Sequence, residues 1–149
     1  MVAQLLTLPR LKKRLSEKKI WNYLNQFQKE HKGAHFTRIE SATINGIPDI
    51  NACIEGKEFW IELKCNRGKN YGISNYQFAW HLKRLQSGGK SFILHLDSKD
   101  SMLEILKVRE SRSRSRCPCI TLLGSVKFQF TGTPGLSRVR EALVLMHSF

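Results

Sequence analysis

Two carboxylates and a lysine near the middle of the chain are spaced so that they could act on a phosphate together. Asp49 and Glu62 flank Glu55-Gly56, which we expect to form a two-residue turn between two strands. Such a turn would place Asp49 opposite Glu62, with Cβ atoms roughly 5 Å apart. Lys64, two residues beyond Glu62, would project from the same face. The three charged side chains would therefore converge on one patch.

Two facing carboxylates repel each other, so a divalent cation between them would stabilise the pair. Carboxylate oxygens suit Mg²⁺ or Mn²⁺, and water and phosphate oxygens can complete the coordination. Such an ion would lower the pKa of a bound water and neutralise charge on the phosphate. Lys64 would orient the nucleophile or stabilise the transition state. The alternative for the same residues is an ordinary cross-strand cluster of ion pairs.

Periodicity and turn residues predict the elements that would position this hairpin. They are, in order, a helix from Glu17 to a stop at Gly33, strands at 35–39, 49–54 and 58–65, a helix opened by a Ser74–Gln77 capping box and ended at 87–89, strands at 91–96 and 102–108, a strand pair within 121–131, and a helix at 137–146. This order predicts an α/β chain of the α+β kind, with a central mixed β-sheet flanked by helices. We expect 1–149 to form a single domain.

Charge indicates the class of partner. The chain has 25 Lys and Arg against 12 Asp and Glu, a formal net charge of +13, which attracts polyanions such as nucleic acid. No apolar run reaches the ~20 residues of a membrane helix, so no membrane partner is expected. The apolar start of the chain precedes its first basic residues, the reverse of a secretory signal, so we expect a cytoplasmic protein.

Pro48-Asp49, followed in a predicted hairpin by Glu62-Leu63-Lys64, resembles the motif of the PD-(D/E)xK nuclease superfamily. The run from Gly46 to Asp49, with the helix and strand that follow, is similar to the VRR-NUC and Holliday-junction-resolvase branches. Phage and homing endonucleases share this core. The resemblance covers about 16–97 and implies a restriction-endonuclease-like core in a prokaryotic or phage-infected cell. It leaves the extension at 98–149 open to a role in DNA binding or oligomerisation.

The resemblance also implies roles for single residues. Asp49, Glu62 and the Leu63 carbonyl would be ligands of Mg²⁺ or Mn²⁺, and Lys64 would be the catalytic lysine. Glu17 matches a helix-borne acidic residue that acts through a metal-bound water, although a Glu at a helix N-terminus is also favoured by the helix dipole. Gln77 matches a glutamine of the family, although its place in the capping box explains it equally well.

Two groups of residues are predicted to contact DNA. Arg67, Lys69, Asn70 and Tyr71 follow the catalytic strand in a basic loop that could follow a phosphate backbone. Arg112, Arg114 and Arg116 belong to an alternating Arg-Ser run, which could fold onto phosphates or be a solvated linker.

The function predicted from these features is a metal-dependent DNA endonuclease, a hydrolase of phosphodiester bonds. Site-specific cleavage of the homing type and structure-specific cleavage of branched DNA both fit the sequence. A non-catalytic nucleic-acid-binding module with a nuclease-like fold is the alternative from a different class.

We predict a homodimer or a dimer of dimers, because one site per chain cuts one strand at a time and a duplex is two-fold symmetric. The C-terminal third offers apolar residues for the interface, namely Ile120, Leu122, Leu123, Phe128, Phe130, Leu143, Val144 and Leu145. Sedimentation equilibrium at micromolar concentration should give at least twice the mass of one chain. A stable monomer that cuts both strands would contradict the prediction.

Overall fold

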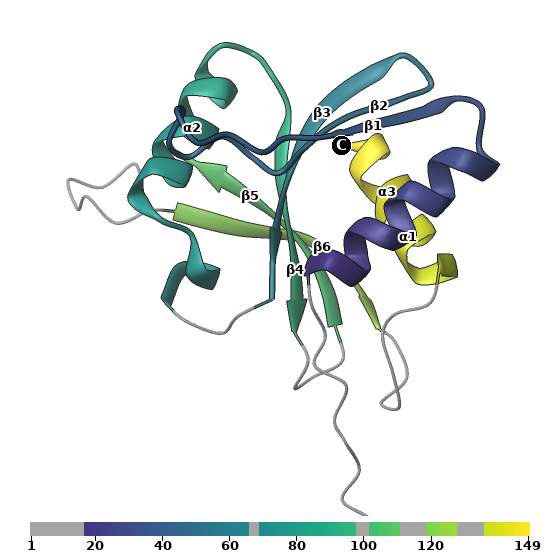
Figure 1. Ribbon diagram of the computed structural model, residues 1–149. Helices are drawn as coiled ribbons and strands as arrows, with labels where there is room; N and C mark the ends of the chain where they lie inside the picture. Colours follow the sequence, from purple (N-terminus) through teal and green to yellow (C-terminus); the bar gives the residue numbers. More distant parts are fainter. Residues whose placement is uncertain (1–16, 66–68, 98–101, 111–118, 128–135) are drawn as a thin grey trace, which may run out of the picture.

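The computed structural model describes residues 17–65, 69–97, 102–110, 119–127 and 136–149 (Figure 1). Its elements are α1 (Glu17–Glu30), β1 (Ala34–Arg38), β2 (Ile50–Ile54), β3 (Lys57–Lys64), the short 3-10 turn η1 (Lys69–Gly72), α2 (Asn75–Gln86), β4 (Ser91–Asp97), β5 (Met102–Arg109), β6 (Cys119–Lys127) and α3 (Leu136–Ser148). Most of these elements lie within one or two residues of the boundaries predicted from the sequence. None of the helices in the described ranges is both long and apolar enough to cross a membrane.

The strands form one six-stranded mixed sheet in the order β1-β2-β3-β4-β5-β6. Neighbouring strands are antiparallel except β3 and β4, which are parallel. A parallel pair needs a crossover connection, and α2 supplies it. The predicted mixed sheet flanked by helices is therefore confirmed.

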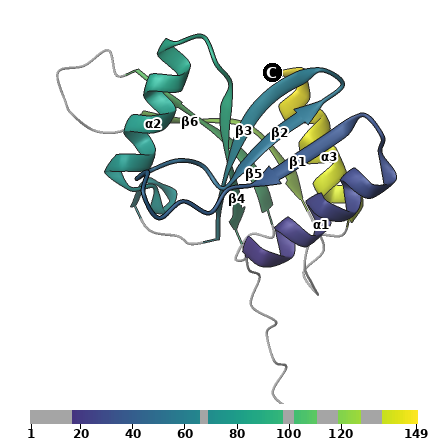
Figure 2. The same cartoon turned by 45° about the horizontal axis from the view of Figure 1, so that its top comes forward.

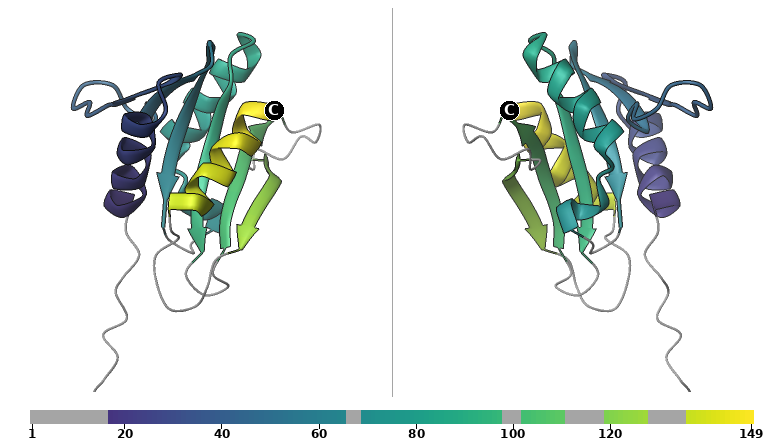
Figure 3. Two further views of the ribbon diagram at one scale, coloured as in Figure 1. Left: turned by 90° about the vertical axis from the view of Figure 1, so that its right-hand side faces the viewer. Right: turned by 90° about the vertical axis from the view of Figure 1, so that its left-hand side faces the viewer.

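Helices cover the two faces of the sheet unequally. One face packs against α1 and α3 and contains the larger apolar core, which includes Leu24, Ile61 and Leu143. The other face packs against α2 through a smaller cluster around Ile93 and Leu106. Figure 3 shows the two layers from opposite sides, with α3 in front of the strands in one view and α2 in front in the other. Residues that alternate along β3 consequently face two different helix layers.

The β2–β3 hairpin has the turn and register expected from the sequence. Glu55 and Gly56 both have positive φ angles, of 48° and 77°, as a tight two-residue turn requires. Ile54 pairs with Lys57 at the turn, and Ile50 pairs with Ile61 at the far end. The apolar residues of both strands face α1 and α3, so Glu62 and Lys64 project toward the α2 side.

The C-terminal third differs from the sequence prediction in two respects. The strand pair expected within 121–131 is wrong for the described part, where one strand, β6, pairs with β5 along its length. Gly124 lies within β6 beside a register shift opposite Ile105 and Leu106, which is a typical place for glycine in a strand. Leu143, predicted for a dimer interface, is buried in the core, whereas Leu122 and Val144 are exposed. Phe128 and Phe130 lie outside the described residues.

The connection between β1 and β2 runs across the molecule to the start of α2 (Figures 1 and 2). Gly46 in this connection has a φ angle of +82°, which side chains disfavour. A Cβ atom at Gly46 would overlap the carbonyl of Tyr76 and crowd the amide of Gln77. The bare backbone of Gly46 therefore allows the segment that leads into Asp49 to pack against the first turn of α2.

Gly46→Ala should destabilise the protein more than Gly88→Ala does. Gly88 has nearly the same φ angle, +81°, but open space where its Cβ would lie, so it is a matched control for backbone strain. We expect about 1 kcal/mol from strain at Gly88 and roughly 1–3 kcal/mol more at Gly46, where backbone must shift. Urea denaturation measures both. Equal losses would show that the close approach of this connection to α2 is not needed.

Candidate active site

The site lies where the β2–β3 hairpin opens, at the carboxyl end of β3. Asp49 directly precedes β2, Glu62 and Lys64 lie in β3, and Gln77 lies in the first turn of α2. The structure thus brings together four of the residues that the sequence singled out, from three segments of the chain.

At the end of the hairpin, the Asp49 side chain takes the place of a backbone hydrogen-bond partner. Its Oδ2 accepts a hydrogen bond from the Leu63 N–H at 2.8 Å. Continued past Ile50 and Ile61, the register would put Pro48 opposite Leu63, and proline has no N–H to donate to the Leu63 carbonyl. Because the N–H and C=O of one strand residue point to the same edge, the Leu63 carbonyl lies on the edge beside Asp49. The Asp49 carboxylate and the Leu63 carbonyl are therefore neighbours at this edge of β3.

Glu62 is almost fully buried, and its two carboxylate oxygens have different surroundings. Oε1 accepts a hydrogen bond from Gln77 Nε2 at 2.5 Å and forms an ion pair with Lys64 Nζ at 3.2 Å. Oε2 is buried and has no hydrogen-bond partner within the described part of the chain. A buried oxygen without a partner is costly, and a cation would satisfy it.

Burial and neighbouring acidic groups raise the pKa of two carboxyl groups of the site, Glu62 and Glu17. Burial, with the nearby charges of Asp49 and Glu17, raises the pKa of Glu62 to about 8, although Lys64 acts in the opposite direction. Burial and the charge of Asp49 also raise the pKa of Glu17. Three acidic groups, Asp49, Glu62 and Glu17, therefore share the site with the cations of Lys64 and Arg38.

Gln77 forms the predicted helix cap and also contacts Glu62. Its Oε1 accepts a hydrogen bond from the Ser74 N–H at 3.0 Å, while Ser74 Oγ accepts one from the Gln77 N–H, so the capping box is confirmed. Its Nε2 is then directed at Glu62. The cap thus fixes the amide that holds one oxygen of the buried carboxylate.

Glu17 is the first residue of α1 and belongs to the electrostatic surroundings of Asp49 and Lys64. Arg38, which also acts on Glu17, lies at the end of β1 with its guanidinium 5.8 Å from the centre of the Trp21 ring. Nothing in the sequence alone singles out Arg38 as a residue of the site. The β1–β2 register, which pairs Arg38 with Ile50, brings it to this end of the sheet.

Two buried histidines near the site were also missed. His95 pairs in register with Lys64, and its Nδ1 lies 3.1 Å from Glu104 Oε1. His81 Nδ1 lies 2.8 Å from Ser91 Oγ, and burial together with the charge of Lys64 lowers the pKa of His81 to about 4. No spacing along the chain signals these contacts, because they depend on how β4 and α2 lie against β3.

The predicted DNA-contacting residues are only partly described. Tyr71 is half-buried, with its ring centroid 5.1 Å from that of His95, and its φ angle of 56° is unusual for a large side chain. The backbone of Lys69 and Asn70 forms η1. Four of the predicted residues lie outside the described ranges, namely Arg67, Arg112, Arg114 and Arg116.

The donor set fits Mg²⁺ or Mn²⁺. Within the described residues, no three His, Cys, Asp or Glu side chains are grouped so that they alone could hold a metal ion. The expected set needs only two side chains, because the Leu63 carbonyl is its third member. The buried Oε2 of Glu62 and the Asp49 carboxylate are hard oxygen donors of the kind that these ions prefer.

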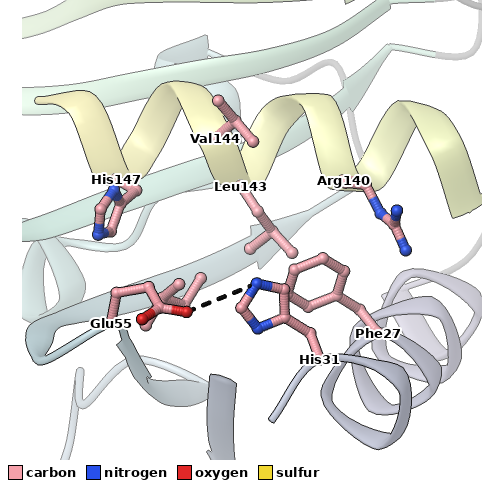
Figure 4. A pocket seen from close by; sticks show the side chains of 8 residues that line it. Phe27, His31, Glu55, Arg140, Leu143, Val144 and His147 are labelled. Carbon is pink, nitrogen blue, oxygen red and sulfur yellow. Dashed lines mark ion pairs between the residues drawn. The ribbon is translucent and has the colours of Figure 1, made fainter. Parts of the chain in front are cut away.

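A pocket of about 270 Å³ lies elsewhere, between α1, α3 and the β2–β3 turn (Figure 4). Its lining is mostly apolar and includes Phe27 and Leu143, with an ion pair of 3.6 Å between His31 and Glu55 at its side. Neither Asp49, Glu62 nor Lys64 lines it. It lies at the opposite end of β3 from the candidate site.

No protein-family model matches the sequence, and no curated protein is significantly similar to it. The assignment of the site therefore depends on the residues and on their geometry.

The metal-free protein should lose stability as the pH rises from about 5 to about 8. The unfolded chain releases the Glu62 proton near the ordinary pKa of 4.5, whereas the folded chain keeps it up to a pKa of about 8, so raising the pH through this window favours unfolding. Glu62→Gln removes this titration. Urea denaturation in EDTA should show the stability of the wild type falling relative to the variant. Parallel curves would contradict the pKa assignment.

Proposed function

We propose that the protein is a metal-dependent endonuclease that hydrolyses phosphodiester bonds in DNA. The main support for the proposal comes from the surroundings of the Glu62 carboxylate. One oxygen is held by Lys64 and Gln77, while the other is buried near the Asp49–Leu63 hydrogen bond and has no partner among the residues that the structure describes. The net charge of +13 supports a polyanionic substrate.

Asp49, Glu62 and the Leu63 carbonyl would hold Mg²⁺ or Mn²⁺. When bound, the ion would activate water as a nucleophile and neutralise charge on the phosphate. Gln77 keeps Glu62 Oε1 occupied, which leaves Oε2 for the ion. Burial of Glu62 excludes water from this side and strengthens the interaction of the carboxylate with a cation.

Lys64 would act on the reacting phosphate. Its ammonium group lies 3.2 Å from Glu62 Oε1, and its side chain is 15% exposed. The ion pair therefore holds the ammonium group in place while part of the side chain reaches the surface. From there it would donate to the attacking water or to the phosphate oxygens, where negative charge develops. Glu17, at the start of α1, would orient a water in the same space.

Both site-specific cleavage of the homing type and structure-specific cleavage of branched DNA remain within this proposal, because phosphate contacts carry no sequence information. A homodimer, with Leu122 and Val144 among its exposed apolar residues, would supply two sites for two strands. A non-catalytic binding module is disfavoured by the joint presence of Asp49, Glu62 and Lys64.

Asp49→Asn and Glu62→Gln should each abolish DNA cleavage and leave DNA binding nearly intact, since binding comes mainly from dispersed basic residues. Lys64→Ala should lower the rate about 10²–10³-fold while metal still binds, the usual loss for one transition-state donor. Nicking of supercoiled plasmid with Mg²⁺, and with EDTA as the blank, measures both effects. Branched junctions run in parallel distinguish the two cleavage modes.

Glu58→Gln is the matched control, because Glu58 is an exposed carboxylate on the same strand and face as Glu62. It should cut like the wild type. Cleavage by Asp49→Asn or Glu62→Gln at the wild-type rate would exclude the proposed metal site. Loss of metal binding in Lys64→Ala would make that lysine a structural residue.

A further inference from the structure

A cluster on the α2 side of the sheet has no part in the chemistry described so far. The Arg84 guanidinium lies 5.3 Å from the ring centre of Trp60 and 4.9 Å from that of Trp80. The two indoles contact each other, with 5.2 Å between their centres. All three side chains are half-buried, so each keeps a part that faces solvent.

Two features fix the side chain of Arg84. Gly89 approaches so closely that a Cβ there would overlap the methylene stem of Arg84. The indoles attract the guanidinium through their ring faces. Within the described part of the chain, no carboxylate forms an ion pair with Arg84. Its planar set of N–H donors is therefore oriented in advance and suited to a phosphate.

The cluster lies beside the candidate active site. Trp60 precedes Glu62 by two residues on the same face of β3, which is about 7 Å along the strand. Gln77, Trp80 and Arg84 are spaced by three and four residues and so lie on one side of α2. Gln77 contacts Glu62, and the other two contact Trp60. Arg84 thus lies close enough to Glu62 for one DNA strand to contact both.

The charges around the cluster favour an anion. Lys83 adjoins Arg84, and Lys90, whose carbonyl accepts a hydrogen bond from the Trp60 N–H, is also exposed. Glu58, two residues before Trp60 on the same face of β3, accepts a hydrogen bond from the Asn51 amide at 2.8 Å. A neutral amide leaves that carboxylate charged, but the cations of Arg84, Lys83 and Lys90 outnumber it.

We propose that Arg84, held between Trp60 and Trp80, binds a backbone phosphate of the DNA strand that is cut, close to the scissile bond. The inference rests on the proposed function, because it takes DNA as the substrate. If the cluster serves only to pack α2 on the sheet, the arginine contributes nothing to the salt dependence of binding. Salt dependence therefore separates the two roles.

The first test measures binding of a duplex of about 20 base pairs in EDTA, by fluorescence anisotropy over a range of salt, with Asp49→Asn as the parent protein. Adding Arg84→Gln should weaken binding about tenfold near 0.15 M salt and reduce the slope of log K against log salt by about 0.9. Arg140→Gln is the control. Arg140 lies 5.4 Å from the Phe27 ring centre, but from α3 on the other face of the sheet. Equal slopes for the two variants would overturn the proposal.

The second test leaves Arg84 unchanged, so it holds even if Arg84→Gln fails to fold. The chain has three tryptophans, and Trp21→Phe leaves Trp60 and Trp80 as the two that emit when tryptophan alone is excited. Saturating DNA should change their emission, because the phosphate contacts the group packed on both rings. Unchanged emission at saturation would overturn the proposal.

The outcomes also separate this inference from the proposed function. A reduced salt slope in Arg84→Gln, combined with wild-type cleavage by Asp49→Asn, would support the phosphate site and refute the metal site. Metal-dependent cleavage with an unchanged slope would refute the phosphate site alone. Absence of any DNA binding by the full chain would refute both.

Discussion

The hydrogen bond from the Leu63 N–H to the Asp49 carboxylate decides where the β2–β3 ladder ends. A ladder that continued would occupy the edge of β3 with backbone partners and leave no room for chemistry. Proline at position 48 removes the next donor, and the aspartate side chain takes the N–H that would otherwise be orphaned. The strands therefore part at the point where β3 presents a carbonyl and the carboxylate of Glu62. The approach of Gly46 to α2 and the contact from Gln77 both hold this opening in place.

Burial of Glu62 gives the opening its electrostatic character. A carboxyl group with a pKa near 8 inside a strongly basic chain is a local conflict, since the net charge alone would favour ionisation. Loss of hydration and the neighbouring acidic groups outweigh that distant charge, because exposed charges are screened over about 10 Å whereas buried neighbours are not. Strongly shifted pKa values of this kind are concentrated at functional sites, where a bound ligand can stabilise a charge that the folded chain alone does not stabilise.

Local patterns in the sequence predicted the parts of the site that depend on local physics. The alternation along β3, the turn at Glu55-Gly56 and the Ser74–Gln77 capping box each follow from a few neighbouring residues, and the structure has all three. The resemblance pointed to Gln77, but the direction of its amide depends on how α2 docks.

What the sequence could not predict depends on register between distant strands. The contact of His95 with Glu104 follows from the pairing of β4 with β5, and its place beside Lys64 follows from the parallel β3–β4 register, which the crossover helix sets. The stacking of Arg84 on Trp60 has the same origin. The single strand β6 replaced an expected pair because tertiary pairing with β5 overrode a local pattern that was ambiguous. Such contacts carry no signature at any fixed spacing.

Contacts on the two sides of the sheet differ in the number of residues that separate the two partners along the chain. Asp49 and Gln77 each reach β3 across 14 or 15 residues, whereas α3 contacts Lys57 and Glu30 across 90 and 110 residues. Loop-closure entropy grows with the logarithm of the span, so joining α3 to α1 costs about 2 kcal/mol more than closing one loop of the site. The loops that bear the chemistry are thus the topologically local part of the molecule. The packing of α3 on α1 closes over a long stretch of chain, and the apolar contacts between these two helices must offset the larger entropy loss.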